Sequence, residues 1–144
     1  MIALLLALLA DPPAPPGSID GLPIGRLAPQ ALPAQGCAAY LFTTGTTRTL
    51  AAMATAEPGA IRLVLDGAVT DYPRVTPGAT ANFGFAPTSE YRLGDVTITL
   101  DMAVISGSAL TDGALISSAT LRIDRGAKDG IVLPLGGLIG CAKK

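Results

Sequence analysis

Histidine and tryptophan are both absent from this chain of 144 residues, and their absence excludes several chemistries at once. Without histidine there is no Ser-His-Asp or Cys-His nucleophile system and no histidine ligand for a metal. The two cysteines would supply at most half of a zinc tetrahedron. No glycine-rich phosphate-binding loop follows a strand and opens a helix. We therefore expect a protein that is not an enzyme and that uses no cofactor and no metal.

Charged residues are also few, at 15 % of the chain, and the net charge is −1. A protein that binds nucleic acid electrostatically needs a clustered basic face, so no nucleic-acid partner is expected. Hydrophobic residues make up 49 % of the chain, which is enough to build the core of one domain. Seventeen glycines and twelve prolines punctuate the sequence, and this composition is typical of an all-β protein with many turns.

The chain begins with a signal-like apolar segment, residues 1–10. Its apolar run, Ile2–Ala10, is too short to span a bilayer, which needs about 20 apolar residues. The run matches the apolar region of a secretory signal, but no Lys or Arg precedes it. In addition, a small residue is expected three positions before a cut after Ala10, and that position is Leu8. A start upstream of Met1, with this segment as a truncated signal peptide, would explain the missing charge. The alternative is a short buried strand or helix.

Residues 11–35 form a Pro-rich segment that leads into the predicted β-domain, residues 36–144. Proline favours extended backbone and removes hydrogen-bond donors, so the segment is predicted to be a linker or a wrapping segment over the domain. Apolar residues from Leu22 onward favour wrapping for its later part.

The two cysteines, Cys37 and Cys141, enclose the whole β-rich region. In an exported chain an even cysteine count suggests a disulfide, and a bridge here would require the first and last strands to lie side by side. Two alternatives remain open at this stage. The cysteines could be separate buried thiols, or Ala34–Cys37 could be a lipoprotein acylation box. The disulfide interpretation supports an exported protein, periplasmic or extracellular, with no membrane-spanning segment in the mature chain.

The β-domain shows apolar runs separated by turn signals at the spacing of a sandwich or small barrel. The longest run, residues 95–105, alternates between apolar and polar side chains, and Asp66-Gly67 is a strong hairpin signal. Residues 46–57 are ambiguous because several are good helix formers. We predict strands at 37–43, 46–54, 61–65, 68–75, 80–86, 95–105 with an extension toward 110, 114–125 and 131–139. The predicted fold class is therefore all-β: a single small antiparallel β-sandwich or partly closed barrel of about eight strands.

Aromatic and arginine side chains gather in one stretch of about twenty residues, and such side chains are favoured at protein interfaces. Phe83 and Phe85 are expected to point the same way on the predicted strand 80–86. The candidate interface residues are Tyr72, Arg74, Phe83, Phe85, Tyr91 and Arg92. The alternative is that the rings fill one end of the core.

Three functions are compatible with these patterns. The first is an exported, non-catalytic β-domain of the cell envelope that binds another macromolecule, either a protein or another envelope component. The second is a small barrel that holds an apolar ligand in a cavity of several hundred Å³. The third is a hydrolase that uses carboxylates alone, which needs two acidic side chains within about 5–10 Å of each other in a cleft.

Overall fold

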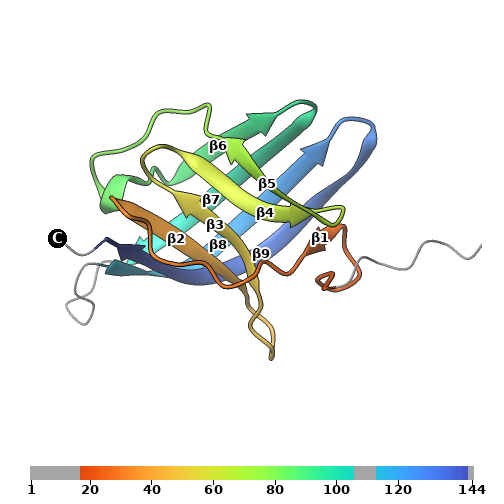
Figure 1. The fold of residues 1–144 in the computed structure, drawn as a ribbon, viewed down its shortest axis with the longest axis horizontal. Coiled ribbons are helices and arrows are strands. Elements are labelled where there is room, and N and C mark those ends of the chain that lie inside the picture. The colour runs from red at the N-terminus through yellow and green to blue at the C-terminus, as the bar shows by residue number, and fades with distance from the viewer. Residues whose placement is uncertain (1–16, 106–112, 143–144) are drawn as a thin grey trace, which may run out of the picture.

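The computed structural model describes residues 17–105 and 113–142, and these form one curled antiparallel sheet (Figure 1). The predicted fold class is confirmed, since the sheet makes a partly closed barrel. The signal-like segment 1–10, the first part of the Pro-rich segment and the proposed extension beyond Ile105 lie outside the described residues.

The strands follow one another along the chain with short turns between most of them. They are β1 (Ile24–Gly25), β2 (Cys37–Thr43), β3 (Leu50–Thr55), β4 (Ala60–Leu65), β5 (Ala68–Pro73), β6 (Thr88–Leu93), β7 (Val96–Ile105), β8 (Gly113–Arg125) and β9 (Lys128–Cys141). One 3-10 turn, η1 (Asn82–Gly84), lies between β5 and β6.

Strands β2 to β5 form one meander and β6 to β9 a second. The first and last strands of these meanders, β2 and β9, pair antiparallel from Cys37↔Cys141 to Thr43↔Leu135. On the other side, the residue that follows β5 and a residue of β6 form one isolated bridge, Arg74↔Tyr91. Eight strands therefore form a ring that is closed firmly at β2–β9 and only partly at β5–β6.

The disulfide predicted between Cys37 and Cys141 is present, with the two Cα atoms 4.0 Å apart. The two cysteines are directly opposite each other in the β2–β9 ladder. The first and last strands of the ring are therefore joined both by backbone hydrogen bonds and covalently.

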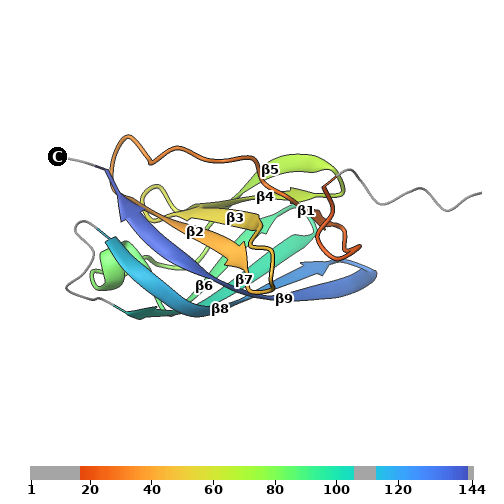
Figure 2. The same cartoon turned by 90° about the horizontal axis from the view of Figure 1, so that it is seen from below.

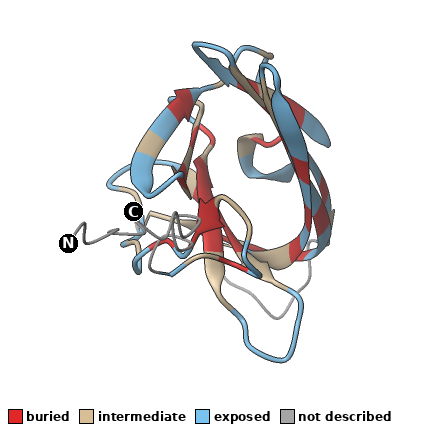
Figure 3. Ribbon diagram, turned by 90° about the vertical axis from the view of Figure 1, so that its right-hand side faces the viewer, coloured by how far each residue is buried: buried red, intermediate tan, exposed pale blue. Residues whose placement is uncertain are grey.

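The core fills the inside of the ring because alternate side chains of each strand point inward. In β7, the predicted strand 95–105, Ile98 and Leu100 are buried while Thr97 and Thr99 lie on the other face. Figure 3 looks along the molecule and shows the sheet curling around its buried positions. The largest fully buried side chains include Leu41, Ile61, Leu63, Phe85, Tyr91, Ile98, Leu100, Ile116, Leu121 and Ile123.

The turn predicted at Asp66-Gly67 joins β4 and β5, and both residues have positive φ, 50° and 82°. This is the backbone that a two-residue hairpin of this kind requires. The ambiguous segment 46–57 contains β3 rather than a helix, since its alanines pack between β2 and β4. Tertiary packing therefore overrides its helix propensity.

The strand predicted at 80–86 is wrong. Asn82, Phe83 and Gly84 all have positive φ and form η1, and the strand of this region is β6, at Thr88–Leu93. The two rings do not point the same way, because Phe83 is exposed whereas Phe85 is buried in the core. The left-handed backbone at η1 breaks the alternation on which the strand prediction depended.

A second correction concerns β9, for which the nearly continuous apolar sequence predicts two covered faces. The inner face is covered, but Val132 and Leu138 on the outer face are 63 % and 44 % exposed. The β8–β9 register shifts beside its glycine pair, between Ile116 and Ala119 of β8. A Cβ added to Gly137 would overlap the carbonyl oxygen of Tyr40, so only glycine allows β2 and β9 to approach this closely.

Candidate functional site

The predicted aromatic and arginine residues are close in the fold but do not share one surface. Tyr72, Phe85 and Tyr91 are buried and belong to the core inside the ring. Phe83 and Arg92 are exposed. The core-filling alternative therefore describes the three buried rings, and only the exposed pair is available to a partner in this structure.

Arg74 lies at the β5–β6 bridge and is engaged with backbone. Its Nη1 donates to the Ala56 carbonyl oxygen at 2.9 Å, and its Nε donates to that of Thr76 at 3.0 Å. Beside it, burial raises the pKa of Tyr91, and Ser89 and the charge of Arg74 oppose that rise. The Tyr91 hydroxyl nevertheless finds no partner in hydrogen-bonding geometry among the described residues.

A different region of the surface has the features of a binding site, and it begins with the segment we call the strap, residues 26–33. Figure 2 shows the chain after β1 running along the outer side of β3 and β4 towards the start of β2. Within the strap, Leu27 is buried against Tyr40 and Met53 of the sheet. The Leu27 amide donates to the Leu50 carbonyl at 2.9 Å, and the Tyr40 hydroxyl donates to the Ala31 carbonyl at 2.9 Å.

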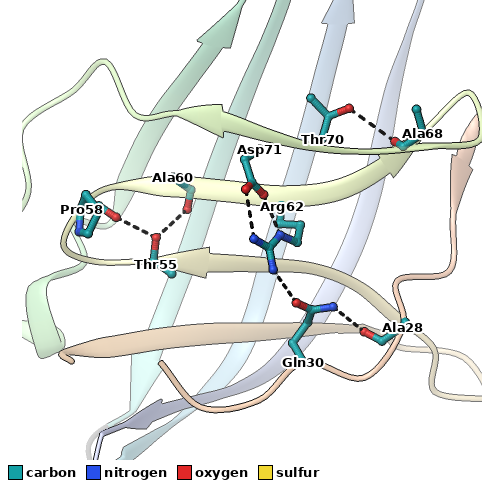
Figure 4. A network of polar contacts seen from close by, with 9 residues as sticks. All are labelled: Ala28, Gln30, Thr55, Pro58, Ala60, Arg62, Ala68, Thr70 and Asp71. Atoms are coloured by element: carbon teal, nitrogen blue, oxygen red, sulfur yellow. Dashed lines mark hydrogen bonds and ion pairs between the residues drawn. The ribbon is translucent and has the colours of Figure 1, made fainter. Parts of the chain in front are cut away.

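A polar network fixes the middle of the strap to the sheet (Figure 4). Arg62 on β4 makes a bidentate pair with Asp71 on β5, with nitrogen–oxygen distances of 2.7 and 3.0 Å. Its third nitrogen donates to Gln30 Oε1 at 2.7 Å. The hydrogen bond from Arg62 lowers the pKa of Asp71, and the same contact raises the pKa of Arg62. The strap therefore has an apolar anchor at one point and a charged anchor at another.

Between the strap and the base of the β2–β3 loop lies a groove of about 460 Å³, which we call the strap groove. Its apolar walls come from the strap and from the outward side chains of β2 and β3, and its polar residues are Arg26, Gln30 and Arg48 with two loop threonines. The lining comprises Arg26, Leu27, Pro29, Gln30, Tyr40, Phe42, Thr47, Arg48, Thr49 and Leu50. The volume is within the range of small-ligand sites, about 300–1,000 Å³.

Next to the strap groove, three large apolar side chains form a straight line across the outer face, which we call the apolar row. Ile105 on β7 is opposite Leu115 on β8, and Leu115 is opposite Leu138 on β9. Residues directly opposite each other point to the same face. The three are 51, 49 and 44 % exposed, and Leu138 is in turn opposite the strap-covered Tyr40.

The β2–β3 loop joins the two surfaces. Its residues 44–48 are exposed, and Figure 1 shows the loop projecting from the ring. A pocket of about 230 Å³ on the side of the loop facing β8 contains Phe42 and Arg48, which also line the strap groove, together with Leu115 of the apolar row. The strap groove, the loop and the apolar row therefore form one continuous surface.

Sequence reasoning missed this surface, although a signal for it was present. In a strand with one solvent-exposed face, apolar and polar residues alternate. In contrast, β9 and the end of β7 carry apolar residues at both odd and even positions. We interpreted that pattern in β9 as complete burial, but Leu138 shows that it also arises when an exposed face is apolar.

Carboxylates are sparse in the pockets formed by the described residues. Asp20 is the sole carboxylate in one pocket and Asp101 in another, while the strap groove and the pocket beside Leu115 contain none. Across residues 17–105 and 113–142, no group of three or more Cys, Asp or Glu side chains is placed to hold a metal ion. The same residues include no helix that is long and apolar enough to cross a membrane.

Comparison with known protein families, with curated proteins and with solved structures gives no match.

Proposed function

We propose that this protein is an exported, non-catalytic β-domain of the cell envelope that binds a protein partner through the apolar row. The observation that carries the proposal is the alignment of Ile105, Leu115 and Leu138, each about half exposed, at opposed positions of three neighbouring strands. Apolar side chains exposed singly are ordinary, but contiguous ones rimmed by polar residues mark interaction sites. The rigid sheet below holds them in fixed positions, which reduces the entropy lost on binding.

The proposed compartment is supported by the Cys37–Cys141 disulfide. Disulfides persist in oxidising compartments such as the periplasm and the extracellular space and are rare in the cytosol. The apolar run at 1–10 supports the same compartment from the sequence.

The two other functions have less support. The pockets named above open at the surface, and none of their linings includes the central core residues Leu100 and Leu121, so these pockets give no support to an apolar ligand inside the ring. A hydrolase that uses two carboxylates would need them to converge in one cleft, and no described pocket brings two together.

Photo-crosslinking tests the proposal. A photoreactive amino acid placed at Leu115 in the oxidised protein should crosslink one discrete protein in an envelope extract. The matched control position is Val69, which is 63 % exposed on the outer face of β5, and it should not give that product. Leu138→Asp should abolish the product at position 115. Identical products at both positions, or none at position 115, would overturn the proposal.

A further inference from the structure

The strap groove carries positive charge without any balancing negative charge. Arg26 and Arg48 both line it, and no carboxylate does. Neither guanidinium forms an ion pair with any residue in the described part of the chain. An arginine next to an apolar wall is well suited to bind a carboxylate, because its planar group donates two parallel hydrogen bonds.

The apolar part of the groove is short. Its floor on β2 consists of Tyr40 and Phe42, which are two residues apart and hence about 7 Å apart along the strand. Leu27 and Leu50 close its sides. A floor of this length holds one large side chain, whereas a long acyl chain would extend well beyond it.

Given the partner-binding function proposed above, we propose that the strap groove accepts an acidic peptide segment of the partner, with one large apolar side chain next to a carboxylate. The side chain packs on Tyr40 and Phe42, and the carboxylate accepts hydrogen bonds from Arg26 and Arg48. Because Phe42 and Arg48 also line the pocket that contains Leu115, the same partner can reach the apolar row. Aromatic and arginine side chains are the residue types that most often dominate binding energy at protein interfaces.

The test uses small probes on the full-length oxidised protein, followed by amide chemical shifts in NMR spectra. N-acetyl-L-leucine carries both groups, N-acetyl-L-leucinamide lacks the carboxylate, and N-acetylglycine lacks the apolar side chain. We expect saturable shifts at Leu27, Phe42 and Leu50 with N-acetyl-L-leucine. Affinity for the other two probes should fall by about five- to tenfold, since each loses one of the two interactions.

Variants assign the charge contribution without disturbing the fold, because both arginines are exposed. The double variant Arg26→Gln, Arg48→Gln should bind the acid no better than its amide. Arg122→Gln removes an exposed arginine on the outer face of β8 and should leave affinity unchanged.

Four outcomes would overturn the inference: no saturable shifts with N-acetyl-L-leucine, shifts confined to other residues, equal affinity for acid and amide, or tighter binding of dodecanoate, which would assign the groove to a lipid. None of them bears on the crosslink from Leu115. That crosslink would still appear if only this inference failed, and it would be lost if the proposed function failed.

Discussion

The ring of strands is joined in two very different ways. At β2–β9, seven opposed positions and a disulfide connect strands that are 104 residues apart at their cysteines. At β5–β6, the strands follow each other in the chain, yet they share one bridge, with the Val75 amide donating to the Glu90 carbonyl at 2.8 Å. The distant pair is strongly joined, and the neighbouring pair is left largely open.

Loop entropy explains part of this difference. Closing a long loop costs more conformational entropy than closing a short one, so the β2–β9 joint needs more favourable contacts to form. The disulfide lowers that cost by restricting the unfolded chain. The strap adds packing on the same side of the ring, against β2 and β3. The contacts that hold the ring closed are therefore concentrated around β2 and β9. The contact between β5 and β6, which we call the seam, is the least supported part of the ring.

The largest expected effect comes from removing the covalent part of the joint. Replacing both cysteines with serine should lower the free energy of unfolding by about 4–5 kcal/mol, because the bridge closes a loop of 104 residues. Urea denaturation of the oxidised protein and the variant measures this. A loss below about 1 kcal/mol would show that the β2–β9 ladder is sufficient without the bridge.

The next largest effect comes from the close approach of β2 and β9 in the same joint. Gly137→Ala should destabilise the protein by about 3 kcal/mol, because its Cβ would overlap the Tyr40 carbonyl oxygen and force β2 and β9 apart. Gly45→Ala in the β2–β3 loop is the control, since a Cβ there meets open space. Equal stability of the two variants, measured by thermal unfolding, would contradict the close-approach explanation.

Loss of the strap anchor should weaken the same side. Leu27→Ala should cost about 2–3 kcal/mol, the usual cost of emptying a buried leucine site. Leu32→Ala in the same segment should cost far less because Leu32 is half exposed. Hydrogen exchange should show faster opening of β3 and β4 in the Leu27 variant. Unchanged exchange would mean that the strap lies on the sheet without stabilising it.

Removing one tyrosine hydroxyl near the β2–β9 joint and another at the β5–β6 seam allows the stability of the two regions to be compared. Tyr40→Phe removes a hydrogen bond to the Ala31 carbonyl and should cost about 1 kcal/mol. Tyr91→Phe at the seam removes a hydroxyl that has no partner among the described residues, so stability should stay the same or rise slightly. A loss at Tyr91 as large as that at Tyr40 would reveal a hidden partner for its hydroxyl.

The smallest effect concerns pH and the pair that holds the strap to β4 and β5. The pKa of Asp71 is lowered in the folded protein, so the pair contributes fully above the unfolded pKa, about 3.9, and is lost as the pH falls through the folded value. Both side chains are more than one-third exposed, so the contribution should stay below about 1 kcal/mol. The difference in unfolding free energy between wild type and Asp71→Asn should shrink between pH 5 and about pH 2. If the difference in unfolding free energy does not change with pH, the Arg62–Asp71 ion pair does not contribute to stability.

Much of the ring was predictable because its signals are local or covalent. The alternation in β7, the Asp66-Gly67 hairpin and the cysteines at the ends of the β-domain each led to the correct element. The turn at Phe83 was not predictable, since Phe83 favours a strand by propensity yet has a left-handed backbone, with φ of 60°. The surface that we propose for binding was not predictable either. It depends on the alignment of Leu115 with Leu138, and register between strands cannot be read from either strand alone.

The disulfide has one further consequence for a chain cut in the exposed connection before η1. A protease that cleaves between Thr80 and Ala81 would produce two fragments, each containing one four-stranded meander. Cys37 belongs to the first fragment and Cys141 to the second, so the nicked molecule would migrate as a single species until a reductant is added. The disulfide would therefore keep the two meanders together after a cut in the connection between β5 and β6.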